Sequence, residues 1–450
     1  MNSMRLLPYK QQVSSLLRLG LPIVVGQLGM IILGLADTIM IGHHSTEELA
    51  AAAFVNNVFN LAIIFATGFS YGLTPLIGML QGGGNTQGIG RVFRNALAAN
   101  ASVAVLLTAV MYTVYCFVDK LGQPEELLPH IRPYFVLQLI SLLFIMLFNG
   151  FRQFAEGLTD TRTPMWILLG GNALNIFGNY LLIYGSFGFP EWGLFGAGVS
   201  TLVSRIVMLL VFIGVVAVAR RYKVYREAIL RSRFNRNDFM QLNALGWPIA
   251  LQMGMETAAF SLSAIMVGWL GSIPLAAHQI MISVSTIGFM VYYGMGAALA
   301  VRVSHFMGQK DFSNLRRAVN SGMGIILSLA IVASLFFYLA RTPIIYSFTE
   351  DHEVMVVVSS LIFSLIVYQF GDALQITFAN ALRGTTDVKP MMWIAFFSYF
   401  IVALPVGYLC GFTWGGGVVG VWVAFPAGLF TAGFLFWLRF RYRLQQLMKK

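Results

Sequence analysis

Twelve apolar stretches, each long enough to cross the roughly 30 Å hydrocarbon core of a bilayer, follow one another along the 450-residue chain. They lie near residues 16–40, 50–78, 93–117, 131–157, 164–187, 194–219, 241–269, 275–303, 318–340, 354–382, 390–412 and 417–438. Only 10% of the residues are charged, whereas a soluble domain carries about 25%. The chain is therefore predicted to be an all-α polytopic membrane protein with twelve transmembrane helices.

Lys and Arg are distributed unevenly over the segments between these stretches. If the N-terminus is cytoplasmic, 25 of the 29 basic residues fall on the cytoplasmic side, and only Lys120, Arg132 and Arg341 fall outside. This asymmetry is the one that the positive-inside rule describes. It accounts for the net charge of +11 without a nucleic-acid partner, and we expect none. We expect a multi-pass protein of the bacterial inner (plasma) membrane with both termini in the cytoplasm.

The two halves of the chain repeat each other. The segment LGLPI at 19–23 matches LGWPI at 245–249, an offset of 226, and GLTD at 157–160 matches GTTD at 384–387, an offset of 227. These offsets pair further residues, among them Arg91 with Arg317 and Trp166 with Trp393. Chance rarely sustains one register over so many positions.

The repeat predicts the domain organisation. Each half holds six spans, an even number, so both halves enter the membrane from the same side and form a parallel repeat. We predict an N-lobe over residues 1–219, a polar cytoplasmic linker over 220–238 and a C-lobe over 239–450. Two such six-helix bundles are expected to enclose a V-shaped central cleft, as in secondary transporters.

Three carboxylates lie well inside predicted spans: Asp37, Glu256 and Asp372. A charge at bilayer depth costs at least ~2.5–3.5 kcal/mol on insertion scales, and such residues face a bundle interior or a water-filled cavity. Structural ion pairs or hydrogen bonds between helices are the alternative, but Arg205 is the only basic residue well inside a predicted span, away from its ends, so three ion pairs cannot form. We therefore interpret the three carboxylates as functional.

Polar residues accompany Asp372 along one face of its predicted helix, at spacings of 4, 4, 3 and 5: Ser364, Tyr368, Asp372, Gln375 and Asn380. Oxygen ligands beside a carboxylate suit a hard cation or a proton. A polar seam between two helices would give a similar stripe without a ligand. We favour the site, because a seam seldom needs a carboxylate.

Two other predicted helices carry polar pairs four residues apart, which places both members on one face. Gln252 precedes Glu256 by four residues, and Asn175 precedes Asn179 by four. The two amides of the second pair can ligate a cation beside Asp37, or they can be plain hydrogen-bonding contacts between helices. The residues alone leave both interpretations open.

The order of these motifs resembles the multidrug and toxic compound extrusion (MATE) family, in particular its NorM-like branch. The resemblance covers essentially the whole chain and is carried by LGLPI with GLADTIMIG, by GWPIALQMGMETAAF, by YQFGDALQ and by RGTTDVKPMMW. It implies a cation-coupled antiporter, not an enzyme, which exports amphipathic, often cationic organic compounds by alternating access. The coupling ion would be Na⁺ or H⁺, with no cofactor.

The resemblance also implies two sets of site residues. An N-lobe site for a cation or substrate would comprise Asp37, Asn175, Asn179 and Thr201. A C-lobe cation site, with Na⁺ as its possible metal, would comprise Glu256, Tyr368 and Asp372. The expected partners are small-molecule drugs, organic cations and the lipid bilayer, and we expect the chain to act as a monomer.

Other functions fit the sequence less well. A flippase or exporter of lipid-linked or other polar metabolites is expected to carry several Arg or Lys inside its spans to meet phosphate, and here only Arg205 qualifies. An intramembrane aspartyl protease needs paired carboxylates, but Asp37 and Asp372 lie in opposite halves without a protease motif. A membrane scaffold needs no buried carboxylate at all.

Overall fold

The computed structural model describes residues 6–449, which form helices and connecting turns without a β-strand in that range. Two basic residues counted above on the cytoplasmic side, Arg5 and Lys450, lie outside the described residues. Within residues 6–449, twelve helical segments are long and apolar enough to cross a membrane, which confirms the predicted all-α architecture. They are α1 (Tyr9–His44), α2 with α3 (Thr46–Ser70, Leu73–Gly82), α4 (Thr86–Cys116), α5 (Leu128–Gly157), α6 (Arg162–Ile183), α7 (Gly193–Val218), α9 (Arg236–Gly268), α10 (Ser272–Gln309), α11 (Phe312–Leu339), α13 (His352–Gly384), α14 with α15 (Lys389–Phe396, Leu404–Tyr408) and α16 with α17 (Gly417–Trp422, Ala424–Lys449). The short helices α8 (Lys223–Arg231) and α12 (Arg341–Phe348) lie between these segments.

The chain forms two compact units whose boundaries fall inside α1 and α9. One unit, here called the N-unit, comprises residues 25–250. The other, the C-unit, comprises the described part of residues 1–24 together with 251–449. The units therefore differ from the predicted lobes at two helix starts: the start of α1 packs in the C-unit, and the start of α9 packs in the N-unit.

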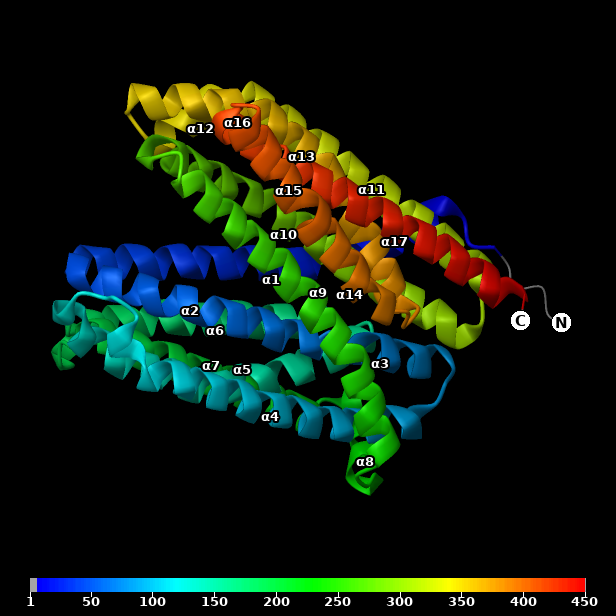
Figure 1. Cartoon of the computed structure of the whole chain (residues 1–450). Coiled ribbons are helices and arrows are strands. Elements are labelled where there is room, and N and C mark those ends of the chain that lie inside the picture. Colours follow the sequence, from blue (N-terminus) through cyan, green and yellow to red (C-terminus); the bar gives the residue numbers. More distant parts are fainter. Residues whose placement is uncertain (1–5, 450) are drawn as a thin grey trace. The chain divides into compact units, whose positions relative to one another are not determined.

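A central helix organises each unit. In the N-unit α5 packs against α2, α4 and α7, and α6 packs on α7 (Figure 1). In the C-unit α13 packs against α10, α11 and α17. The helices α5 and α13 are the fourth spans of the two repeats, so the repeated sequence corresponds to a repeated packing arrangement.

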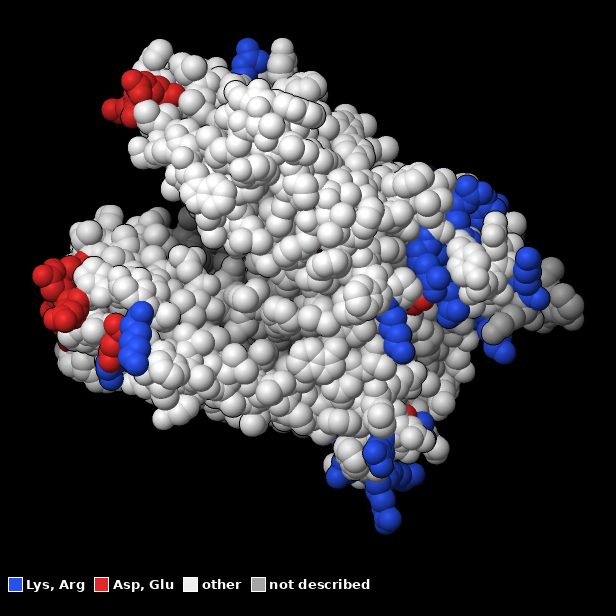
Figure 2. All heavy atoms as spheres, in the orientation of Figure 1, with Lys and Arg blue, Asp and Glu red and all other residues white. Residues whose placement is uncertain are grey.

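Charged side chains are segregated along each unit. Lys and Arg gather mainly at one end, Asp and Glu gather at the other, and a broad band of uncharged atoms separates them (Figure 2). An uncharged band of this kind suits the hydrocarbon core of a bilayer, where every exposed charge is costly.

The predicted linker contains a helix that packs on the N-unit. Helix α8 lies against α4, and the two backbones come close at Gly90, where a Cβ atom would lie 2.4 Å from the carbonyl carbon of Ala228. Any side chain at position 90 would therefore push α8 away from α4. The glycine explains why this polar segment is held against the bundle.

Tyr222, just before α8, anchors the same segment. Its hydroxyl donates to Asp160 Oδ2 over 2.6 Å, and Arg221 Nη1 lies 2.8 Å from the same oxygen. Burial and the hydrogen bond to Asp160 raise the pKa of Tyr222 above its ordinary value, so this phenol remains a donor.

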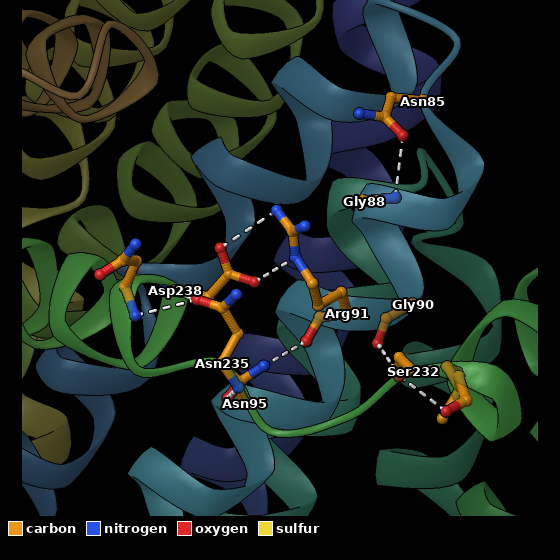
Figure 3. A network of polar contacts seen from close by, with 10 residues as sticks. Asn85, Gly88, Gly90, Arg91, Asn95, Ser232, Asn235 and Asp238 are labelled. Carbon is orange, nitrogen blue, oxygen red and sulfur yellow. Dashed lines mark hydrogen bonds and ion pairs between the residues drawn. The ribbon is translucent and has the colours of Figure 1, made fainter.

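The start of α9 is held on α4 by a polar network (Figure 3). Arg91 Nε donates to Asp238 Oδ2 over 2.5 Å, and Asn95 Oδ1 accepts from the backbone nitrogen of Asn235 over 2.9 Å. Asn235 in turn accepts from the backbone nitrogen of Asp238 over 3.2 Å, which satisfies a free N–H group in the first turn of α9.

The C-unit holds the start of α1 at the equivalent place. Arg317, which the repeat pairs with Arg91, donates from Nη1 to the backbone oxygen of Leu7 over 3.0 Å. The backbone nitrogen of Leu7 donates to Asn314 Oδ1 over 2.9 Å. In each unit these hydrogen bonds hold the start of one helix, α9 in the N-unit and α1 in the C-unit. The remaining residues of that helix belong to the other unit.

Replacing Arg91 with glutamine is expected to lower the stability of the N-unit modestly. The carboxylate of Asp238 is only 9% exposed and would lose its ion pair, while Arg91 itself is half exposed. A loss of about 1 kcal/mol, or roughly 2 °C in melting temperature, is expected. Thermal unfolding of the detergent-purified protein measures it, with the exposed Arg233→Gln as the matched control. Equal melting temperatures for both variants would contradict the stabilising role assigned to the ion pair between Arg91 and Asp238.

Candidate functional site

Four residues from three helices form one polar chain inside the N-unit. Asn179 Nδ2 donates to Asp37 Oδ1 over 2.6 Å and to Asn175 Oδ1 over 3.1 Å. Asn175 Nδ2 donates to Thr201 Oγ1 over 3.1 Å. The structure thus places Asp37 of α1, the two asparagines of α6 and Thr201 of α7 together; these are the four residues that the resemblance implies for the N-lobe site.

The side-chain amide of Asn175 fits this hydrogen-bonded network in either of two orientations. If the Asn175 amide is turned over, its nitrogen lies 3.0 Å from Asp37 Oδ1, and its oxygen accepts from Thr201. Asn175 belongs to the network in either orientation. Asn175 and Asn179 are buried, whereas Asp37 and Thr201 are partly exposed, so the chain of polar groups leads from the interior to an accessible carboxylate.

Close packing of α6 on α7 fixes this geometry. Ser200 Oγ donates to the backbone oxygen of Asn175 over 2.8 Å, next to Thr201. At Gly178 a Cβ atom would lie 2.4 Å from Ser200 Oγ, so only glycine permits this approach. The site therefore depends on Gly178, the chain neighbour of Asn179, although this glycine has no side chain of its own to offer.

Replacing Gly178 with alanine is expected to destabilise the N-unit and to weaken the site. The added methyl group must displace Ser200, and overpacking of this kind costs typically about 1–3 kcal/mol. Gly170→Ala on the same helix is the matched control, because a Cβ there meets nothing within 4 Å. Melting temperature and cationic-dye binding measure the effect. Equal values for the two variants would contradict the proposed role of the glycine.

Arg205 lies one helical turn after Thr201 and is held by α5. Its Nη1 donates to Gln138 Oε1 over 3.2 Å and also to Ser141 Oγ. Both partners are buried, and the charges of Arg205 and Asp37 interact. The N-unit site thus contains a fixed cation as well as a carboxylate. Sequence reasoning noted Arg205 but did not find Gln138 or Ser141.

The C-unit places Glu256 among amides. Glu256 Oε2 accepts from Gln252 Nε2 and from Gln375 Nε2, each over 3.0 Å. Gln252 lies one turn earlier on α9, and Gln375 belongs to the polar stripe of α13, so two motifs far apart in the sequence meet at one carboxylate.

Asp372 has a different environment. It is 1% exposed, and neither of its carboxylate oxygens has a hydrogen-bond partner among the described residues. Tyr368, one turn earlier on α13, is 5% exposed, and its phenol interacts with both Asp372 and Glu256. The three residues predicted for the C-lobe site therefore lie together.

Nearby, Tyr292 of α10 donates its hydroxyl to Gln369 Oε1 over 2.8 Å. Tyr292 is 1% exposed, and its phenol interacts with Asp372. This pair adds α10 to the helices around Asp372. The sequence pattern had not singled out either residue.

Arg205 is not the only basic residue within a membrane-spanning helix. Arg383 lies inside α13, is 5% exposed and donates from Nη2 to Gln252 Oε1 over 2.8 Å. Arg152 lies inside α5 and pairs with the buried Glu156 over 2.7 Å. Both residues lie near the ends of their helices, where polar partners accompany them in the buried interior.

Among residues 6–449, no three His, Cys, Asp or Glu side chains are placed to hold a metal ion together. A cation in either unit would depend instead on one or two carboxylates and on neutral oxygens. Oxygen-only ligand sets suit hard cations rather than transition metals.

Comparisons with known proteins agree with this geometry. A family model described as MatE matches residues 22–181 and 248–409, one segment in each half of the repeat. The multidrug resistance protein NorM of Photobacterium profundum is 30% identical over 448 residues, with 96% of each protein covered.

Solved structures share the fold. A mutant of the Vibrio cholerae MATE transporter VcmN superposes with a TM-score of 0.88 at 18% identity, covering 98% of this chain and 99% of that one. A MATE protein crystallised in a straight conformation gives a TM-score of 0.89 at 20% identity, covering 98% and 97%.

Proposed function

Because the chain belongs to the MatE family, we propose that it is a cation-coupled multidrug antiporter. It would export amphipathic, often cationic organic compounds by alternating access, in exchange for Na⁺ or H⁺. The observation that supports ion coupling is the environment of Asp372. This carboxylate lies inside a membrane-spanning helix, is 1% exposed and has no hydrogen-bond partner among the described residues.

The physical argument begins with the cost of an isolated charge. A buried carboxylate without a partner is stable only when it takes up a proton or binds a cation. The amides around Glu256 supply donors to one of its oxygens but no net positive charge. A C-unit of this composition is therefore expected to load and release one cationic species in each cycle.

The N-unit would supply the second half of the exchange. Asp37 is partly exposed and bonded to a neutral amide, so an organic cation can compete with Na⁺ or H⁺ for it. Competition at carboxylates links the inward flow of ions to the outward flow of drug. A membrane potential adds ~2.3 kcal/mol per charge moved per 100 mV.

The segregated charges support an orientation. We place the basic ends of both units in the cytoplasm of a bacterial cell, with the protein in the inner membrane, because Lys and Arg are retained on that side. We also propose a monomer, since each cluster is built from residues of one unit of a single chain.

The test is dye transport by the purified protein in vesicles, with Na⁺ and H⁺ gradients imposed separately. A cationic dye should move against its own gradient when at least one ion gradient opposes it. Dye movement that ignores both gradients would contradict the proposed function.

A further inference from the structure

Seven buried side-chain oxygens in the described part of the C-unit have no hydrogen-bond partner, and four of them belong to residues around Glu256. These four are both carboxylate oxygens of Asp372, Oε1 of Gln375 and the hydroxyl of Tyr399. The three residues are no more than 2% exposed. Buried polar atoms are nearly always paired, and each unpaired group costs about 1–3 kcal/mol. Four such oxygens around one carboxylate indicate a group that binds there.

The four oxygens gather around Glu256. Gln375 lies one turn after Asp372 on α13, and its amide nitrogen already contacts Glu256 Oε2 over 3.0 Å. The hydroxyl of Tyr399 faces the Glu256 carboxylate as a weak donor, without the geometry of a full hydrogen bond, and Tyr399 also interacts electrostatically with Asp372. Its ring also borders a small cavity with Ala259 and Phe260, the residues one turn after Glu256. The volume of this cavity, about 10 Å³, is close to that of one water molecule.

An irregular helix presents Tyr399 to this cluster. Residues Phe397–Ala403 form a π-helical segment, which interrupts the span between α14 and α15. Wider π-helical turns add a residue to a helix and occur frequently at functional sites. Tyr399 therefore lies on a stretch whose geometry departs from the regular helix found in the equivalent span, α6.

The internal repeat shows the added residue. In the N-unit the carbonyl of Leu182 packs against Gly196, and in the C-unit the carbonyl of Cys410 packs against Gly420 in the same way. Leu182 follows Trp166 by 16 residues, whereas Cys410 follows the equivalent Trp393 by 17. The insertion changes which side chains this helix presents, so the C-unit has no counterpart of the Asn175 and Asn179 pair here, and the buried polar groups of this segment are Ser398 and Tyr399.

Four neighbouring oxygens, two of them neutral, suit a metal cation. A single proton pairs all four only if Asp372 donates it to Gln375 Oε1 and the Tyr399 hydroxyl donates its own hydrogen to a carboxylate. A hard cation contacts several oxygens at once, including neutral ones. We propose that Tyr399 is a ligand of the coupling cation and that its hydroxyl, with Gln375 Oε1 and the carboxylates, adapts the C-unit to Na⁺. This inference rests on the proposed function.

The experiment removes only the hydroxyl. Tyr399→Phe is expected to weaken Na⁺ binding about tenfold, the loss expected for one polar contact to a charged group. Without Na⁺ its melting temperature should stay close to that of the unchanged protein, since the hydroxyl makes only a weak contact with Glu256. Binding of ²²Na⁺ and the rise of melting temperature with Na⁺ are measured on the detergent-purified full chain.

The matched control is Tyr408→Phe, which removes a hydroxyl from the same span at a side chain that is 50% exposed. It should bind Na⁺ normally. Gln375→Met removes another of the four oxygens and is expected to weaken Na⁺ binding as well, so the test does not depend on one variant. Unchanged Na⁺ affinity in both Tyr399→Phe and Gln375→Met would overturn the inference.

Failure of this inference is distinguishable from failure of the proposed function. If the unchanged protein transports dye in response to H⁺ but neither binds nor responds to Na⁺, the assignment of Tyr399 as an Na⁺ ligand is overturned and antiport stands. If its dye transport ignores both ions, the proposed function is overturned.

Discussion

Replacing Asp372 with asparagine is expected to lower the cation affinity of the C-unit about 100-fold and to abolish ion-driven dye transport. The bound cation must offset a burial cost of ~2.5–3.5 kcal/mol for the carboxylate, which corresponds to about two decades in affinity. Asparagine has nearly the same shape and no charge. Ion-driven dye uptake and ²²Na⁺ binding by the reconstituted variant measure the effect.

The stability of the same variant provides an independent check. Because both oxygens of Asp372 are unpaired among the described residues, the asparagine protein should be at least as stable as the unchanged one in the absence of coupling ions. Glu353→Gln, an exposed carboxylate in the first turn of the same helix, is the matched control and should transport normally. Normal ion-driven transport by Asp372→Asn would show that this carboxylate does not carry the coupling.

Replacing Asp37 with asparagine is expected to weaken binding of a cationic dye at least about tenfold and to reduce efflux accordingly, because the N-unit site would lose its only carboxylate and retain the cation Arg205. The helix should remain folded, since an asparagine oxygen can still accept from Asn179. Equilibrium dye binding in detergent, measured at low salt, reports this loss directly.

The control for this variant is Glu47→Gln, an exposed carboxylate at the start of the next helix. It should bind dye as the unchanged protein does. If Asp37→Asn also binds dye normally, then the substrate does not use the N-unit carboxylate, and the account of competition there is wrong even if Asp372 carries the coupling.

Much of the fold could be predicted from hydropathy. A bilayer requires long apolar helices, and a lone carboxylate within one stands out against them, which is why Asp37, Glu256 and Asp372 were found. The repeat then identified two equivalent halves. The contacts of Asn179 with Asp37 and of Gln375 with Glu256 follow helix faces that the spacings of three and four residues had already indicated.

The burial of charged residues near helix ends was harder to predict. The windows 131–157 and 354–382 end within two residues of the ends of α5 and α13, but hydropathy does not report that Arg152 and Arg383 are buried there. Arg152 pairs with Glu156 of the same helix, whereas Arg383 donates to Gln252 of another helix. A window of apolar residues cannot report partners that come from other helices. The pairing of Arg383 with Gln252 needed the structure.

Tyr399 was missed for a different reason. It lies in an apolar run without a charge or a periodic polar neighbour, and the π-helical turn shifts the face on which it lies. A signal was nonetheless present. The offset between the halves is 226 at LGLPI and 227 at Trp166, and a further change to 228 by Leu182 would have marked an inserted residue.

The most direct test of the account is the reverse exchange. Vesicles containing the purified protein are loaded with a cationic dye, and uptake of ²²Na⁺ and of protons is recorded while the dye leaves down its gradient. The account predicts that dye efflux drives uptake of at least one of these ions, and that Asp372→Asn abolishes this uptake while Glu353→Gln does not. Dye efflux of equal rate without movement of either ion would contradict it.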